Sequence, residues 1–533
     1  MNNRLQTSTT LSPFFIKNWL AVFLFSLLTY FYYIINFLWG NHDWGWIKEK
    51  TPLFSGVFEG RFSQFILQTI LTEGYILPII TLILSFFFYS LGITLLLHIL
   101  GLKKSLLQNS LIGIFALTSP YTISWLYFAF ISLSCLSWPF FIILAFYLLT
   151  TLNTTPYPKT CFTISSILFL LSMGGYPPVI NMIGTVFFIL VIDMLYFKRY
   201  TLKSVIKKIL PMIFSIFISI VLLLIIQYFL KKYNLQHTTY NTASLSLSNI
   251  TPKLYETLIA SFEQFTNTTS FITYFYKYIT LCLTLSSVYV LITRCYGNTI
   301  NFFLLFVLLL GLNLSSVITN LIAQNTLYVL LQPRIEFFGI LYIYIFSASV
   351  LLKQDNIFIK NLTLLSLILI IFNNVNTINY SAKVQKLGFM AETQLINRIT
   401  ADIENKVPSS TYKKHTFIQG GVLNYRNRFY FQNPNENVDG YTLSAPYIPW
   451  HLPSKAYKFY AQTDIFGEDF DVYWRFVPQK IINQSPSIKD YLLHQAKPWP
   501  DNNSIFTENN LIVLILNDEG LKQGISWIKK YQH

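Results

Sequence analysis

Apolar residues run along most of this chain in stretches longer than the core of a soluble helix requires. Eleven such stretches lie at residues 18–39, 76–100, 109–128, 130–151, 161–175, 177–196, 209–230, 274–293, 300–322, 335–352 and 358–378. A helix that crosses the hydrocarbon layer needs about 20 apolar residues, and its backbone groups must be paired within the segment. Residues 1–380 are therefore predicted to form an all-α polytopic membrane domain of about eleven transmembrane helices.

Turn-forming and polar residues interrupt this pattern at informative positions. The segment Gly174-Gly175-Tyr176-Pro177-Pro178 separates two apolar stretches, and it predicts that one helix ends and the next begins in a tight turn. Residues 62–71, between the first two stretches, have apolar residues at about helical spacing with polar residues between them. This pattern predicts a helix that lies in the membrane interface.

The pattern changes at about residue 381 to that of an ordinary soluble domain. Residues 391–407 have the spacing of an amphipathic helix, and residues 414–419, 428–432 and 510–516 have the composition of strands. Residues 381–533 are therefore predicted to form a small α/β or α+β domain after the membrane domain.

Composition agrees with a membrane protein: 53% of the residues are hydrophobic, 17% are aromatic and only 11% are charged. The net charge of +15 is concentrated in residues 1–380, which contain 21 Lys and Arg against 9 Asp and Glu. An excess of basic residues beside apolar stretches sets the orientation of a protein in the membrane and attracts anionic lipid headgroups. The predicted partner of this charge is the lipid bilayer, and no nucleic-acid partner is predicted.

The distribution of basic residues also predicts which loops lie inside. Asp193 lies near the inner end of its stretch, beside Lys198 and Arg199, and is predicted to form an ion pair there. Alternation of the stretches from a cytoplasmic N-terminus places the basic cluster at 198–208 inside, as the positive-inside rule requires. The same alternation places residues 40–75, 231–273, 323–334 and the tail from 381 outside.

Motifs of soluble enzyme chemistry are missing from the sequence. The four cysteines lie in or beside apolar stretches, so neither a disulfide framework nor a zinc site is indicated. There is no glycine-rich phosphate loop, nucleophile elbow or His-Glu-x-x-His segment. The sequence therefore predicts no metal and no cofactor.

Asp43 is the first candidate for a catalytic residue, because acidic residues are scarce in the membrane part. It lies just beyond the first apolar stretch, between aromatic residues that include Trp44 and Trp46, and Arg61 follows in the same loop. A partly desolvated carboxylate that still faces water suits a general base or a stabiliser of positive charge. The alternative is an interfacial loop anchored by its tryptophans, in which Asp43 is merely solvated.

Arg61 and Arg334 are candidates for binding an anion. Both are predicted to lie outside, next to membrane stretches, and guanidinium groups suit the oxygens of a phosphate or pyrophosphate. The alternative for Arg334 is that it extends to lipid headgroups or pairs with Glu336.

The order of these landmarks resembles a known class of membrane enzyme. The acidic outer loop is followed by Gly60-Arg61 and a surface helix, then by Ser119-Pro120-Tyr121 running to Trp125-Leu126-Tyr127-Phe128, Met173-Gly174-Gly175-Tyr176, and Pro333-Arg334 at an outer helix start. This order is similar to the membrane glycosyltransferases of the GT-C fold class, and more narrowly it resembles the type II Gtr glucosyltransferases that decorate O-antigen.

The resemblance implies a GT-C-like fold and transfer of a hexose, glucose in that family, to a glycan acceptor such as O-antigen. The donor would be a polyprenyl-phosphate-linked sugar, and transfer would occur on the outer face of the bacterial inner membrane without a nucleotide or metal. By the same resemblance Asp43 would deprotonate the acceptor, while Arg61 and Arg334 would hold the donor phosphate. The candidate substrate-binding residues are His42, Trp44, Trp46, Glu59, Arg61, Tyr176, Gln332 and Arg334.

Two other functions remain open at this point. A transporter or flippase of lipid-linked sugars would need polar groups near the bilayer midplane and often has repeated halves, and the sequence shows neither clearly. A membrane-anchored protein that presents its outer domain to a glycan or protein partner would use the aromatic residues of the tail, among them Trp450, Trp474 and Trp499.

Overall fold

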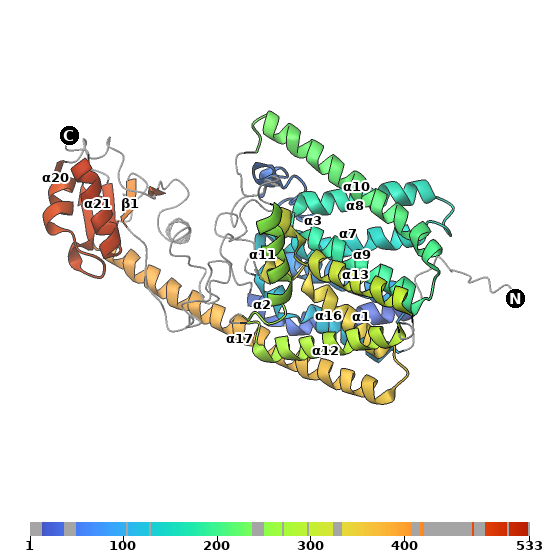
Figure 1. The fold of residues 1–533 in the computed structure, drawn as a ribbon. Helices are drawn as coiled ribbons and strands as arrows, with labels where there is room; N and C mark the ends of the chain where they lie inside the picture. Colours follow the sequence, from blue (N-terminus) through green and yellow to red (C-terminus); the bar gives the residue numbers. More distant parts are fainter. Residues whose placement is uncertain are drawn as a thin grey trace. The chain divides into compact units, whose positions relative to one another are not determined.

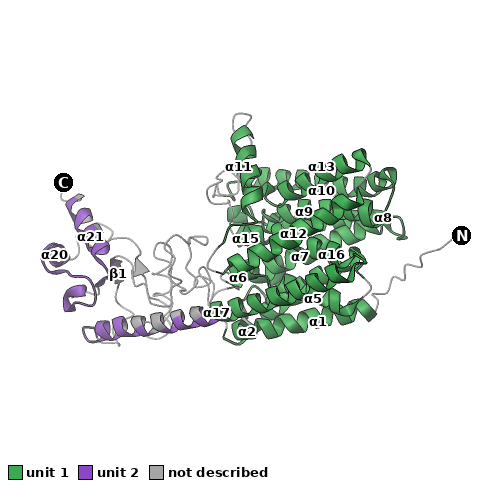
Figure 2. Cartoon of the chain, turned by 60° about the horizontal axis from the view of Figure 1, so that its bottom comes forward, with its two compact units in different colours: residues 1–37, 48–381 green, residues 38–47, 382–533 purple. Residues whose placement is uncertain are grey.

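The structure is a computed structural model that divides into two compact units. It describes residues 13–36, 50–102, 105–126, 129–236, 250–268, 271–295, 298–322, 333–407, 416–420, 472–473, 486–508 and 511–530. The first unit comprises residues 1–37 and 48–381, and the second comprises residues 38–47 and 382–533 (Figure 2).

The described part of the first unit is built of helices, most of which lie side by side in a bundle (Figure 1). They are α1 (Pro13–Thr29), α2 (Phe31–Asn36), η2 (Ser55–Glu59), α3 (Ile66–Thr72), α4 (Pro78–Ile99), α5 (Leu106–Leu117), η3 (Pro120–Thr122), α6 (Ile123–Leu126), α7 (Ala129–Thr150), α8 (Pro158–Gly175), α9 (Val179–Ile192) with η4 (Asp193–Phe197), α10 (Leu202–Lys232), α11 (Ile250–Glu263), α12 (Tyr274–Arg294), α13 (Thr299–Ser315), α14 (Ile318–Ile322), α15 (Pro333–Glu336), α16 (Ile340–Leu352) and α17 (Ile357–Glu404).

Every apolar stretch predicted from the sequence contains a helix. Within the described residues, six segments are long and apolar enough to cross a membrane: Ile79–Ile99, Ile131–Thr150, Val179–Phe197, Leu202–Lys232, Tyr274–Arg294 and Ile357–Leu387. Four shorter apolar helices accompany them, at Pro13–Thr29, Leu106–Leu117, Thr299–Ser315 and Ile340–Leu352. The prediction of a helical membrane domain is confirmed, whereas the number of eleven crossings stays a prediction.

Several predicted helices are interrupted where the sequence contains a helix breaker. The predicted tight turn is confirmed, because α8 ends at Gly175 and α9 begins at Val179. The span predicted at 109–128 is divided, because α5 ends at Leu117 and Pro120, which lacks a backbone N–H donor, starts the short η3 turn. The segment predicted as a helix at 62–71 contains α3, Ile66–Thr72, and its position at the membrane interface stays a prediction.

Neighbouring helices of the bundle are joined by hydroxyl and amide side chains. α4 packs against α7, α7 against α8, α8 against α10, α1 against α4 and α5, α9 against α13, and α12 against α16. Buried hydrogen bonds join several of these pairs, with distances of 3.0 Å for Ser110–Asn18, 2.9 Å for Ser166–Ser215 and 3.1 Å for Ser287–Ser347. Such contacts are the usual polar links between helices in an apolar solvent.

A buried ion pair joins the end of α9 to the end of α16. Asp193 is fully buried, and its carboxylate lies 2.5 Å from Nζ of Lys353 and 3.1 Å from Nζ of Lys198. The predicted pairing of Asp193 with Lys198 is thus confirmed, and Lys353 is a second partner that the sequence did not indicate. Because Lys353 comes from another helix, this pair fixes the relative position of α9 and α16.

Lys353→Met is expected to lower the free energy of unfolding by about 3 kcal/mol, because it removes one of two cations from a fully buried carboxylate. Thermal unfolding of the detergent-solubilised protein measures the change. Lys198→Met should cost less, since that side chain is 32% exposed against 14% for Lys353. Equal stability of Lys353→Met and the wild type would contradict the prediction.

Helix α17 differs from the sequence prediction in its length. The predicted span at 358–378 and the predicted amphipathic helix at 391–407 are parts of one continuous helix, Ile357–Glu404. No proline lies between them, and the single Gly388 costs a helix only about 1 kcal/mol relative to alanine. The change in composition near residue 381 therefore does not coincide with a helix end.

The second unit contains a small sheet with strand order β2-β1-β4-β3. β1 (Thr416–Gly420) is parallel to β2 (Val472–Tyr473) and β4 (Leu511–Ile515), and β3 (Ile505–Glu508) is antiparallel to β4. The predicted strands at 414–419 and 510–516 are confirmed as β1 and β4, whereas residues 428–432 lie outside the described residues.

The core of the second unit forms between the sheet and its helices. β4 is buried along its whole length, and α20 (Pro486–Asp490), η8 (Tyr491–Gln495) and α21 (Asp518–Lys530) supply the side chains that cover it. The C-terminal part of α17 is tied to the same unit, because Nε1 of Trp499 donates to Asp402 at 2.9 Å and Nζ of Lys406 donates to the carbonyl of Ile505 at 2.8 Å.

Candidate functional site

The segment that carries Arg61 is fastened to the end of α8. The backbone N–H of Ser63 donates to the carbonyl of Gly174 at 3.3 Å, and the Ser63 hydroxyl donates to the carbonyl of Leu171 at 2.5 Å. The hydroxyl of Ser134, from α7, donates to the carbonyl of Gln64. Because three hydrogen bonds hold this segment, Arg61 lies on a rigid support.

Arg61 has donor capacity beyond the partner that the structure gives it. Its Nη1 lies 2.9 Å from Oε2 of Glu59, and its guanidinium lies 5.3 Å from the centre of the Tyr176 ring. Its Nε is buried, and no described residue accepts a hydrogen bond from it. A guanidinium has five N–H donors, so Arg61 can bind a further anion while it keeps its contact with Glu59.

Tyr176 connects Arg61 to an aromatic cluster at this end of the bundle. The Tyr176 ring centre is 5.1 Å from that of Trp125 and 5.8 Å from that of Phe338. Trp125 also contacts Phe338, at 5.7 Å, and Phe337, at 6.1 Å. The aromatic cluster, Trp125, Tyr176, Phe337 and Phe338, thus joins the turn before α9 to the residues that follow α15.

Arg334 reaches the same region from α15. It is half-buried, α15 packs against η3 and α6, and the Phe338 ring, just after α15, lies 5.8 Å from that of Tyr176. Two arginine-bearing segments that are far apart in the sequence therefore converge on the aromatic cluster. Two cations beside aromatic rings can hold the oxygens of a phosphate ester and pack against a sugar ring.

The structure describes only some of the other site residues that the sequence predicted. Glu59 contacts Arg61, and the Tyr176 ring lies beneath the Arg61 guanidinium, so the structure brings these three candidates together. His42, Asp43, Trp44, Trp46 and Gln332 lie outside the described residues, and their roles stay predictions. No group of three His, Cys, Asp or Glu side chains that could hold a metal ion occurs in the described ranges.

One charged cluster beside the site was missed by the sequence reasoning. Lys277, in the first turn of α12, and Glu336, at the end of α15, are almost fully buried and lie 3.6 Å apart. The sequence could have indicated both residues, because each is a charged residue inside a predicted apolar stretch. Charged residues in such stretches usually face the protein interior and have a specific role.

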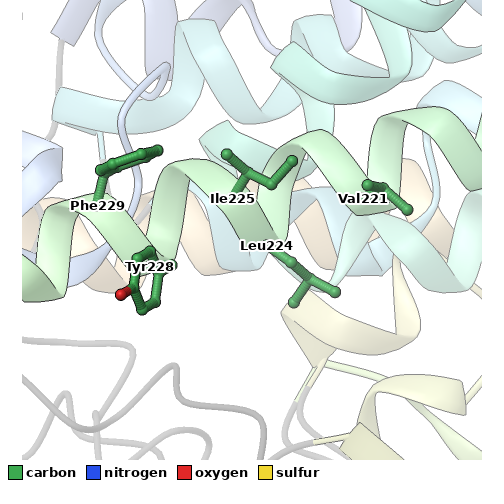
Figure 3. A pocket seen from close by; sticks show the side chains of 5 residues that line it. All are labelled: Val221, Leu224, Ile225, Tyr228 and Phe229. Carbon is green, nitrogen blue, oxygen red and sulfur yellow. The ribbon is translucent and has the colours of Figure 1, made fainter.

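An apolar groove on α10 does not share the chemistry of this site. Val221, Leu224, Ile225, Tyr228 and Phe229 line it, and their side chains project from successive turns of the helix (Figure 3). Only 17% of the most apolar 18-residue stretch of α10 is buried inside the protein. The groove therefore matches a lipid-facing surface, and it brings no charged group to a substrate.

Comparison with known proteins gives one clear result. The family model described as Glucosyl transferase GtrII matches residues 51–352, which is more than half of the chain and includes Glu59, Arg61, Tyr176 and Arg334. The match confirms the resemblance inferred from the sequence motifs. Neither the curated proteins nor the solved structures gave a match to this chain.

Proposed function

We infer the reaction of this protein from its family, because the chain belongs to the glucosyl transferase GtrII family and is therefore a membrane glycosyltransferase. We propose that it transfers glucose from a polyprenyl-phosphate-linked donor to a glycan acceptor such as O-antigen on the outer face of the bacterial inner membrane. An acceptor hydroxyl attacks the anomeric carbon of the donor, and the bond from that carbon to the phosphate oxygen breaks. The lipid phosphate leaves with the bonding electrons.

The convergence of Arg61 and Arg334 is the observation that carries this proposal. The leaving lipid phosphate gains negative charge as the glycosidic bond breaks, so fixed cations beside it stabilise the transition state more than the ground state. Arg61 has a buried Nε without an acceptor among the described residues, and it contacts Tyr176, whose ring also contacts Phe338 just after the helix that carries Arg334. Both arginines lie within the segment that matches the family.

We propose Asp43 as the general base, and this role rests only on its position in the sequence and on the family resemblance. It would accept the proton of the acceptor hydroxyl as the new bond forms, which completes the proton balance of the reaction. His42, Trp44 and Trp46, from the same loop, and Gln332, next to α15, are proposed to contact the sugars.

The arrangement of basic residues supports an extracytoplasmic location for the reaction. α9 begins beside Tyr176 and ends at the cluster of Asp193, Lys198 and Lys353, so this basic cluster and the arginine site lie at opposite ends of the helix. Basic residues collect on the cytoplasmic side of membrane proteins. We therefore place the arginine site, and the soluble domain at 381–533, on the outer side.

Arg61→Ala is expected to lower kcat/KM for the lipid-linked donor by about 10²-fold, the usual effect of removing one donor to a developing negative charge. Arg61→Lys should be intermediate, since an ammonium keeps the charge but not the fork geometry. The assay uses the purified full-length protein, polyprenyl-phosphate [¹⁴C]glucose and membranes that carry the host glycan, and it measures labelled glycan as the covalent product.

Lys50→Ala is the matched control, because Lys50 belongs to the same loop and forms an ion pair with Glu73 in which both side chains are mostly exposed. It should leave transfer unchanged. Movement of the labelled donor across a liposome membrane without a covalent product would favour the flippase. Full transfer by Arg61→Ala would remove the proposed phosphate contact.

A further inference from the structure

The Lys277–Glu336 ion pair is buried next to the arginine site, and its charges are costly to place there. Only 1% of the Lys277 side chain and 3% of the Glu336 side chain are exposed. A buried ion pair commonly gives no more stability than apolar side chains of the same size would give. The pair therefore needs an explanation other than stability, and its contacts indicate one.

Lys277 joins α12 to three other segments. Its Nζ donates to the hydroxyl of Tyr121 in η3 at 2.7 Å, donates to the carbonyl of Gln264 just after α11, and lies 3.6 Å from Oε1 of Glu336 in α15. An ammonium group has three N–H donors. Lys277 thus makes two hydrogen bonds and one ion pair, and each contact comes from a different segment of the chain.

Helix α15 is only one turn long, and hydrogen-bonded turns at residues 337–339 connect it to α16. Its position is therefore set by α16 and by contacts such as that of Glu336 with Lys277. A single turn has no appreciable stability of its own, since nucleation of a helix is unfavourable. Gly339, just after the turn, packs so closely that a Cβ atom there would lie 2.0 Å from the carbonyl oxygen of Ser316. The Ser316 hydroxyl in turn accepts from Nε2 of Gln264 at 2.7 Å. One network therefore holds both Glu336 and Gly339.

Arg334 lies in the same turn as Glu336, two residues before it. Residues two apart on a helix project about 200° from each other and do not face the same side. When Glu336 is held against Lys277, Arg334 must project from the other side of α15. A tilt or rotation of this short helix would move the guanidinium directly, because Arg334 is the second residue of α15.

We propose that Lys277 and Glu336 are positioning residues that fix α15 and thereby aim Arg334 at the donor phosphate. This inference rests on the proposed function, in which Arg334 binds that phosphate. A binding constellation must be held to within about 0.5 Å, so an anchor behind the contact residue has a measurable effect on binding. The pair acts through Arg334 and does not touch the substrate.

A double-mutant cycle tests the proposal with undecaprenyl phosphate as the ligand of the purified full-length protein in detergent. Arg334→Ala should raise the Kd about tenfold, which corresponds to one lost charge-assisted hydrogen bond. Lys277→Met should raise the Kd by a similar factor. The double variant should bind no more than about twofold more weakly than Arg334→Ala alone, because a positioning residue has no effect once the residue it positions is absent.

Each result has a distinct meaning. If the effects of Lys277→Met and Arg334→Ala multiply in the double variant, or if Lys277→Met leaves the Kd unchanged while Arg334→Ala raises it, the positioning proposal is wrong and the donor site stands. If Arg334→Ala itself leaves the Kd unchanged, the proposed donor site is wrong and the positioning role falls with it.

Stability controls separate positioning from simple destabilisation. Lys353→Met is the matched variant, since it breaks a buried ion pair at the other end of the bundle, and it should lower the unfolding temperature without changing the Kd. If Lys277→Met is not recovered as folded protein, Glu336→Gln serves in the same cycle. It keeps the side-chain size and one acceptor oxygen, and it leaves the hydrogen bonds from Lys277 to Tyr121 and Gln264 in place.

Discussion

Asp43→Asn is expected to lower the kcat of glucose transfer by about 10²- to 10⁴-fold, which is the usual contribution of a general base. The amide has nearly the same size as the carboxylate, but it cannot accept the proton of the acceptor hydroxyl. Labelled glucose incorporated into the host glycan measures the rate, and surface labelling or membrane fractionation shows that the variant still inserts.

Measuring the affinity for the donor lipid distinguishes the role of Asp43 as a base from the role of the arginines as phosphate ligands. Asp43→Asn should leave the Kd of undecaprenyl phosphate within about threefold of the wild type, since a base does not hold the phosphate. Asp43→Glu keeps the carboxylate and should retain part of the activity, and His42→Gln tests whether the neighbouring residue has a comparable role. Transfer at the wild-type rate by Asp43→Asn would show that the base lies elsewhere.

Gly339→Ala is expected to destabilise the protein by about 3 kcal/mol or more, the upper range for overpacking a buried position. The added Cβ would lie 2.0 Å from the carbonyl oxygen of Ser316, and a backbone atom cannot rotate away as a side chain can. The unfolding temperature and the fraction of monodisperse protein after detergent extraction measure the loss.

Gly101→Ala provides the contrast for this prediction. Gly101 has a φ of +74°, which alanine adopts at some cost, but nothing lies within 4 Å of its Cβ position. The change should therefore cost about 1–2 kcal/mol from the backbone alone. If Gly339→Ala were no worse than Gly101→Ala, the close contact with Ser316 would not hold the segment after α15, and one support for the position of Arg334 would be lost.

Local features of the sequence predicted local features of the structure well. One exception is the stretch 109–128, predicted as a single span, which the structure divides into α5, η3 and α6 at Pro120. The turn containing Tyr176 lies between α8 and α9 as expected, and strands β1 and β4 lie where the sequence predicted strands. Each of these results depends on residues that are close in sequence, because ring geometry and hydrophobic periodicity act over a few residues.

The candidate site could be predicted only as a set of residue types. Arg61 and Arg334 were recognised because arginines at the ends of apolar stretches are few and suit a phosphate. The contact of Arg61 with Tyr176 and the contact of Tyr176 with Phe338, just after α15, depend on how the helices pack. Lys277 was overlooked because its partner, Glu336, was considered only as a neighbour of Arg334.

The sequence by itself determined that this chain is a helical membrane protein with a small mixed domain at its C-terminal end, and its motifs were sufficient to identify the family. The hydrocarbon layer imposes length and polarity on each segment separately, so these properties can be read segment by segment. The tertiary structure alone decided that Lys353 pairs with Asp193, that Lys277 pairs with Glu336, and that Arg61 and the segment after α15 meet at Tyr176. Such pairings follow from the packing of helices distant in sequence, and no local pattern encodes which buried charge will meet which.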